Sequence, residues 1–190
     1  MHEGIVIRTF PSGESDLVLR ILSSQEGKLS AIAKYARSSK RRFSTNLDLF
    51  DHGAFEIKRG RGSLAILQSF SPLPAWRGLR EDLDKFALAN LICESFDLLI
   101  KEGNPDGAEF YEILALGLAA LNESSDLKGA LRASHLALAS LLKVSGFHSD
   151  AETAQPSMKS FLRLMDWIER SAETPMKCRA VVEELLQRLT

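Results

Sequence analysis

The residues best suited to chemistry in this chain lie in one run of ten, residues 34–43. The five cations of this basic stretch are Lys34, Arg37, Lys40, Arg41 and Arg42. It contains no acidic residue, and serines stand where a helix or strand would carry apolar side chains. We therefore expect an exposed segment between structured elements. Because like charges repel, such a segment is either a solvated loop or a contact surface for a polyanion.

The positive charge is concentrated in one part of the chain. The whole sequence of 190 residues has a net charge of −1, which by itself argues against a nucleic-acid partner. Residues 1–80, however, hold 13 Lys and Arg against 7 Asp and Glu, whereas residues 81–190 hold 11 against 18. This asymmetry indicates a polyanion-binding module joined to an acidic one.

A single-strand-binding surface combines a positive groove with stacking rings, and here cations are abundant while aromatic residues near them are few. Tyr35 and Phe43 are the candidate stacking rings, whereas Phe55 and Phe70 are assigned to the core. We expect contacts dominated by phosphates, with low sequence preference. The candidate nucleic-acid-binding residues are Lys28, Lys34, Tyr35, Arg37, Lys40, Arg41, Arg42, Phe43, Arg59 and Arg61.

The sequence shows no other reactive pattern. Cys93 and Cys178 form no Cys-x-x-Cys pair, and the four histidines lack ligand spacing, so we expect neither a metal nor a cofactor. The glycines around Arg61 lack the flanking elements of a phosphate-binding loop and indicate a hairpin turn. No nucleophile elbow occurs, and we expect no enzymatic activity.

The cellular compartment follows from what the sequence lacks. Two cysteines cannot form a disulfide framework, the first residues do not form a signal peptide, and no apolar run reaches the ~20 residues of a membrane span. We expect a cytoplasmic protein that does not bind membranes.

The elements that must position the basic stretch are short strands. Residues 4–70 alternate between apolar and polar side chains, with turn residues in between. One strand, around Leu19, is apolar on both faces, as in a barrel. Five strands ending in a hairpin predict a five-stranded oligonucleotide-binding (OB) barrel, with an SH3-like barrel as the alternative. The expected strands cover residues 4–10, 17–22, 28–36, 47–58 and 63–69.

A helical pattern follows Pro72 and Pro74. Apolar residues then recur at intervals of three and four, which is typical of amphipathic helices. We predict an α+β chain with an OB domain at residues 1–74 and an α-helical domain at residues 75–190. The five expected helices cover residues 78–101, 106–122, 126–144, 158–170 and 175–189.

Several segments of residues 4–70 are shared with one known family. They are Gly4-Ile-Val-Ile-Arg-Thr9, Gly13-Glu-Ser-Asp-Leu-Val-Leu19, Glu26-Gly-Lys-Leu-Ser-Ala-Ile-Ala-Lys34, Ala36-Arg37, Lys40, Arg42-Phe43 and Gly60-Arg-Gly62. Together they resemble the N-terminal domain of the RecO family of bacterial recombination mediators and DNA repair proteins. The helical remainder resembles the family only in order and length.

The resemblance implies an OB barrel followed by a helical domain, binding of single- and double-stranded DNA, and annealing of complementary strands. The partners it implies are RecR, the single-strand-binding protein and, indirectly, the RecA recombinase. The implied location is the cytoplasm, at the nucleoid.

Three features depart from the family pattern. Tyr35 stands where the family often has glycine. Many members carry a four-cysteine zinc module in the helical region, but only Cys178 follows Phe147 here, so we expect no zinc. The net charge of −7 over residues 81–190 also argues against a basic groove for the acidic tail of the single-strand-binding protein.

Two other functions fit the residues. A generic RNA-binding barrel would share the cations and the aromatic rings, and a helical interaction scaffold would need neither. Strand annealing and the effect of removing the cations distinguish these three functions.

Overall fold

The computed structural model covers residues 1–190 and describes all of them except 39–42, 44–46, 60–63, 148–156 and 189–190. The chain divides into two compact units. The barrel unit contains residues 1–75 and 101–112, and the helical unit contains residues 76–100 and 113–190. Residues 101–112 therefore join the barrel unit, although their sequence suggested the helical region. The domain boundary at residues 74 and 75 stays a prediction.

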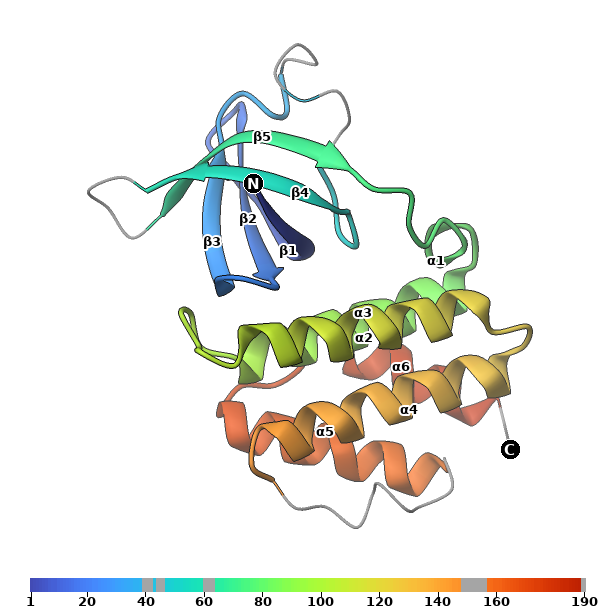
Figure 1. Ribbon diagram of the computed structural model, residues 1–190. Helices are drawn as coiled ribbons and strands as arrows, with labels where there is room; N and C mark the ends of the chain where they lie inside the picture. The colour runs from blue at the N-terminus through green and yellow to red at the C-terminus, as the bar shows by residue number, and fades with distance from the viewer. Residues whose placement is uncertain (39–42, 44–46, 60–63, 148–156, 189–190) are drawn as a thin grey trace. The chain divides into compact units, whose positions relative to one another are not determined.

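Five strands form a closed barrel in the order β1-β2-β3-β5-β4 (Figure 1). β1 pairs antiparallel with both β2 and β4, and β3 pairs in parallel with β5. This order confirms the predicted five-stranded barrel and the fold class, and it leaves no long sheet edge open. The strands are β1 (His2–Ser12), β2 (Asp16–Ser23), β3 (Gly27–Ala33), β4 (His52–Lys58) and β5 (Ala65–Pro72).

The barrel core follows the predicted alternation of side chains. Leu19 and Ile21 of β2 are buried in it, and the rings of Phe55 and Phe70 pack at a centroid distance of 4.8 Å. Leu22 has the opposite parity and is also fully buried, so this part of β2 is covered on both faces as predicted. Burial of these apolar side chains is the main stabilising contribution to the barrel.

The bounds of several strands differ from the prediction, and the end of β1 and the start of β4 have identifiable causes. β1 continues through Pro11, which pairs with Leu17, instead of ending before the proline. β4 begins at His52 instead of residue 47, because the preceding residues form a turn that packs on β1. In this turn, Phe50 donates its N–H to the Val6 carbonyl at 2.9 Å, and Val6 donates to the Asp51 carbonyl at 2.8 Å. Long-range pairing therefore set both boundaries.

Residues 101–112 attach to the turn between β2 and β3. Gly103 donates its N–H to the Lys28 carbonyl at 3.1 Å, and Ser30 bonds to the Glu102 carboxylate. Gly107 lies so close to Gly27 that a Cβ on Gly107 would collide with the Gly27 backbone. Gly27 also has a φ of +68°, which favours glycine. Two glycines thus permit this close approach.

Six helices are present in the described part of the chain. The first predicted helix is divided in two, because Asp82 has an extended backbone and its carboxylate accepts the N–H groups of Asp84 and Lys85. Asp82 thereby caps the second of the two helices. Leu83, expected to face inward, is 82% exposed. The helices are α1 (Gly78–Glu81), α2 (Leu83–Leu99), α3 (Gly107–Glu123), α4 (Leu127–Val144), α5 (Met158–Ala172) and α6 (Arg179–Gln187).

The last helix starts later than predicted. α6 begins at Arg179 instead of Pro175, because the Glu94 carboxylate of α2 accepts the N–H groups of Lys177 and Cys178 at 2.9 and 3.0 Å. These two residues are therefore held outside the helix. Val181, predicted to face inward, is exposed.

The interior of the helical unit contains one buried histidine. His135 of α4 is buried, its ring meets Phe161 edge-on at 5.4 Å, and its Nε2 has no hydrogen-bond partner among the described residues. Burial lowers the pKa of His135 below its usual 6.5. Where the chain is described, no group of three or more His, Cys, Asp or Glu could hold a metal. No helix there could cross a membrane.

We predict that Gly107→Ala lowers the free energy of unfolding by roughly 1–3 kcal/mol, because the added methyl group collides with Gly27. Urea unfolding followed by circular dichroism measures the change. Glu109→Ala, at an exposed position in the same turn of α3, is the matched control and should change stability by less than about 0.5 kcal/mol. An unchanged or more stable Gly107→Ala protein would contradict the close approach.

We predict that His135 makes the protein less stable in acid. The unfolded chain binds the His135 proton first as the pH falls, since burial lowers the folded-state pKa. The stability present above a pH of about 6.5 is therefore lost below it. Between about pH 7.5 and about pH 5.5, the wild type should lose roughly 1 kcal/mol more unfolding free energy than His135→Leu. Equal losses in urea titrations of the two proteins would refute this.

Candidate nucleic-acid interface

The basic stretch begins in a turn that is tied to the β1–β2 turn. Because β2 and β3 pair antiparallel up to Leu17 opposite Ala33, both turns lie at the same end of the barrel (Figure 1). The Tyr35 N–H donates to Asp16 Oδ1 at 2.8 Å, and the Arg37 N–H donates to the Ser15 carbonyl at 2.9 Å. The start of the stretch is therefore fixed beside a loop that OB barrels use to bind oligonucleotides.

The side chains of this turn face solvent. Lys34, Tyr35 and Arg37 are all exposed, and Tyr35 has 58% of its surface accessible. The Arg37 guanidinium also donates from Nη1 to the Gly13 carbonyl at 3.3 Å, which holds that cation over the β1–β2 turn. Three of the predicted site residues, Lys34, Tyr35 and Arg37, therefore lie on the same exposed turn. Lys40, Arg41 and Arg42 lie outside the described residues.

Phe43 corrects the expectation of a second stacking ring. It is only 3% exposed and belongs to the core of the barrel. An aromatic ring gains more free energy from burial in an apolar core than from exposure beside cations. Phe43 therefore anchors the far end of the basic stretch instead of contacting a ligand.

Lys28 is a second correction. It was expected among the residues that contact nucleic acid, but it is buried, with 7% of its surface exposed. Arg59 is exposed and forms an ion pair with Glu26 in the β2–β3 turn. A phosphate would have to compete with that carboxylate, although surface ion pairs are weak. Arg61 lies outside the described residues.

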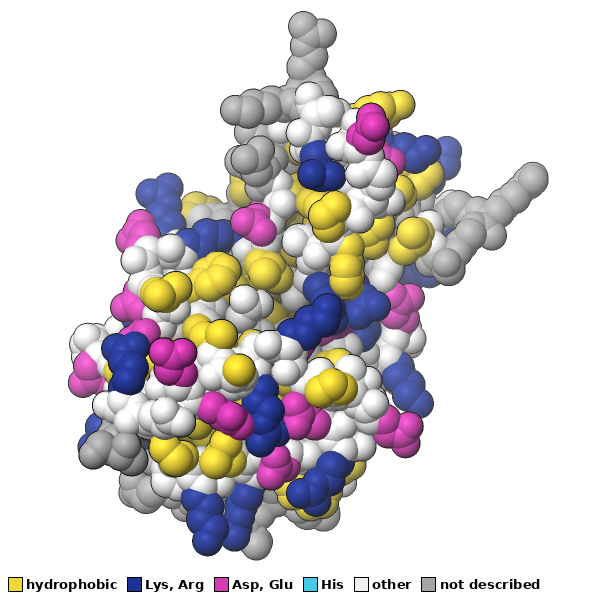
Figure 2. Space-filling view, turned by 180° about the vertical axis from the view of Figure 1, so that it is seen from behind, with side chains coloured by type: hydrophobic (Ala, Val, Ile, Leu, Met, Phe, Trp, Pro, Cys, Tyr) yellow, Lys and Arg dark blue, Asp and Glu magenta, His cyan; other side chains and the backbone are white. Residues whose placement is uncertain are grey.

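A cluster of two arginines and an aromatic ring on β1 and β2 was not predicted from the sequence. Arg8 and Arg20 are cross-strand partners, and their guanidinium carbons lie 4.9 and 5.2 Å from the centroid of the Phe10 ring. Such cation–π contacts hold the planar guanidinium groups in place. Their outward parity on adjacent strands was the available signal, but the strand register was needed to bring them together. The face drawn in Figure 2 shows Lys and Arg interspersed with acidic and apolar side chains.

A third polar cluster links β1, β4 and the start of α3. Glu3 Oε1 accepts from the Tyr111 hydroxyl at 2.7 Å and lies 2.9 Å from His52 Nε2. The bond from Tyr111 is the largest cause that lowers the pKa of Glu3, and burial followed by the same bond raises the pKa of Tyr111. Glu3 lies near the start of β1, whereas the basic stretch adjoins its far end. This cluster therefore links residues 101–112 to the strands within the barrel unit.

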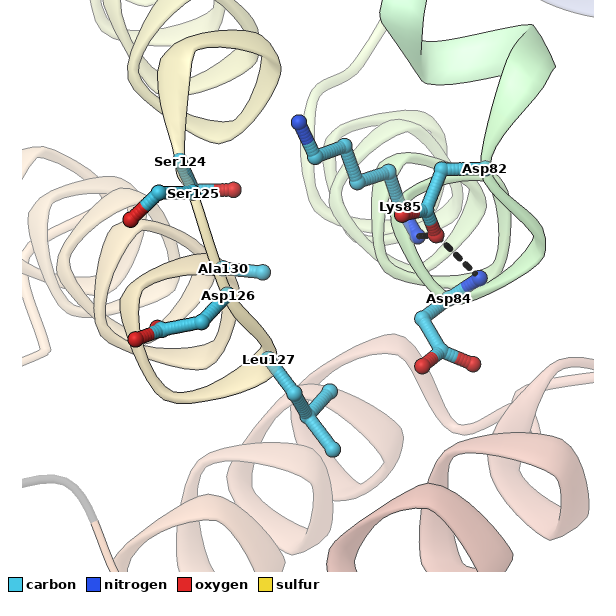
Figure 3. Close-up of a pocket in the computed structure, with 8 residues that line it drawn as sticks. All are labelled: Asp82, Asp84, Lys85, Ser124, Ser125, Asp126, Leu127 and Ala130. Atoms are coloured by element: carbon cyan, nitrogen blue, oxygen red, sulfur yellow. Dashed lines mark hydrogen bonds between the residues drawn. The ribbon is translucent and has the colours of Figure 1, made fainter.

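A small pocket in the helical unit is lined by six polar residues together with Leu127 and Ala130 (Figure 3). Its carboxylates already have structural partners. Asp82 caps α2, Asp126 caps α4 by accepting from Gly129 at 2.7 Å, and Asp84 accepts from Arg188 at 2.7 Å. These carboxylates therefore serve to cap helices and to bind Arg188, and the pocket does not indicate a ligand site.

We predict that the backbone of Tyr35 is strained. Its φ of 60° lies in the left-handed region, which costs a non-glycine residue about 1–2 kcal/mol. Tyr35→Gly should leave stability unchanged or raise it by up to about 1 kcal/mol, since added chain entropy offsets part of the relief. Tyr35→Ala keeps the strain and is the control. Thermal unfolding of the three proteins tests this, and a Tyr35→Gly protein less stable than Tyr35→Ala would contradict it.

Comparison with known proteins places this architecture in a family. The model of the family described as "Recombination protein O N terminal" matches residues 1–75. The DNA repair protein RecO of Anaeromyxobacter sp. (strain K) is 37% identical over 134 residues, which is 70% of this chain and 52% of that protein. For RecO of Symbiobacterium thermophilum the identity is 36% over 141 residues, 74% of this chain and 55% of that protein.

A more distant relative gives the same result. RecO of Nocardioides sp. is 30% identical over 134 residues, which is 70% of this chain and 55% of that protein. The chain spans about half the length of the curated relatives it matches. The matching family model covers the strands of the barrel, and the relatives extend the match beyond it. The chain belongs to the RecO family.

Proposed function

We propose that this protein is a non-enzymatic mediator of recombinational DNA repair that binds single- and double-stranded DNA and promotes strand annealing. One observation carries the proposal: in a member of the RecO family, the basic stretch starts from a turn bonded to the β1–β2 turn of an OB barrel. OB barrels bind oligonucleotides with this loop and the adjacent strands. The names of the curated relatives, DNA repair protein RecO, support the same role.

Binding in this proposal rests on charge neutralisation. Each cation that contacts a phosphate releases counterions, which favours binding in low salt and carries no sequence information. Five cations within residues 34–42 would neutralise five phosphates. Annealing follows from the same effect, because two complementary strands repel one another less where their phosphates are neutralised.

The proposed partners extend beyond DNA. We propose RecR and the single-strand-binding protein as protein partners, and loading of RecA as the outcome, in the cytoplasm at the nucleoid. The net charge of −7 over residues 81–190 does not favour docking of an acidic tail there. We place any such contact on the barrel unit, where the positive charge lies.

We predict that replacing Arg37, Lys40, Arg41 and Arg42 together by alanine removes most DNA affinity and annealing. The fold should persist, because a run of like charges repels itself and contributes little to stability. For single strands, the slope of log K against log salt should be about −3.5 in the wild type and shallower by about 2.8 in the variant. Fluorescence anisotropy at several salt concentrations and an annealing assay measure both effects.

The matched control replaces three arginines and one lysine on the helical unit, Lys128, Arg132, Arg163 and Arg170, by alanine. All four are exposed, so this control changes net charge equally and should retain binding and annealing. DNA affinity retained by the first variant would favour the interaction scaffold. A preference for RNA without annealing would favour the RNA-binding barrel.

A further inference from the structure

Tyr35 has a strained backbone conformation whose energetic cost is not offset by burial of its side chain. Two aromatic residues of the barrel unit, Tyr35 and Phe50, have left-handed φ angles of 60° and 66°. Phe50 is 1% exposed, so burial of its ring offsets the strain. Tyr35 is 58% exposed and gains little from burial. An exposed ring held in a strained backbone points to a role in contacting a ligand.

The backbone around Tyr35 is well fixed. Its N–H donates to Asp16 Oδ1 at 2.8 Å, and its carbonyl accepts from the Ser38 N–H at 3.3 Å. The next anchor is Arg37, whose N–H donates to Ser15 at 2.9 Å. A ring mounted on a fixed backbone loses little conformational freedom when it stacks on a ligand.

The chemistry beside the ring selects the ligand. Lys34 and Arg37, on either side of Tyr35 in the sequence, are exposed cations that suit phosphates. An exposed aromatic ring among cations is the arrangement that holds single strands, because every base has a face on which to stack. In a duplex the base faces are already covered by neighbouring bases, so the ring has no partner there.

We propose that Tyr35 stacks on an unpaired base and gives this site a preference for single-stranded over duplex DNA. The inference rests on the proposed function, since it assumes that DNA binds beside the basic stretch. It assigns separate tasks to neighbouring residues: the cations bind phosphates of either form, and Tyr35 detects an unpaired base. A protein with glycine at position 35 would bind single-stranded and duplex DNA through the cations alone.

The test compares three ligands of equal length: a single strand without self-complementarity, the same strand with abasic sites, and its duplex. Tyr35→Ala should weaken binding of the base-containing single strand roughly 5- to 100-fold, and binding of the abasic strand or the duplex less than about 2-fold. Tyr35→Phe keeps the ring and should bind as the wild type does. The salt slope should not change, since no phosphate contact is lost.

Two controls separate stacking from structural effects. Tyr35→Gly removes the strain together with the ring, so it should lose single-strand affinity without losing stability. Trp167→Ala removes an exposed aromatic ring from the helical unit and should not alter binding. A 2-aminopurine base in the single strand should be quenched by the wild type and Tyr35→Phe, but not by Tyr35→Ala.

The outcomes that overturn the inference differ from those that overturn the proposed function. Equal weakening of all three ligands by Tyr35→Ala would mean that Tyr35 only positions the cations, and no weakening would mean that it contacts nothing. Either result overturns the inference and leaves the proposed function intact. A wild type that binds none of the three ligands overturns both.

Discussion

Closure of the barrel is the constraint on which the rest of the barrel unit depends. β1 pairs with β2 on one side and with β4 on the other, and the parallel pairing of β3 with β5 completes the ring. The antiparallel register of β2 and β3 then brings the turn after β3 beside the β1–β2 turn. The hydrogen bonds of Tyr35 with Asp16 and of Arg37 with Ser15 follow from this register of β2 and β3.

The basic stretch is held at both ends by different forces. Backbone N–H groups of Tyr35 and Arg37 donate to the Asp16 carboxylate and the Ser15 carbonyl and fix its start, and Phe43 at its end is buried in the barrel core. Cations that are close together in the sequence repel one another, so their concentration here adds no stability of its own. A binding loop supported by a rigid scaffold is a common arrangement, because loops tolerate residues chosen for function instead of packing.

Much of the fold could be predicted because strands and helices leave short-range patterns of apolar residues in the sequence. Period-two alternation identified the five strands, and the apolar stripes identified the long helices. The errors occurred where a distant residue decided the local structure. Glu94 delays the start of α6, and pairing with Leu17 carries β1 through Pro11. The split at Asp82 is different, because its cap on α2 was a local signal that the apolar stripe concealed.

The candidate site was predicted in part for the same reason. The sequence alone determined three features: the concentration of positive charge, the five-stranded barrel and the resemblance to one family. Each of them depends on residues that are close together in the chain. Only the tertiary structure decided which of the candidate side chains are exposed and which are buried. It buried Phe43 and Lys28, exposed Tyr35 and placed Arg8 opposite Arg20, because burial and strand register depend on contacts between residues far apart in the chain.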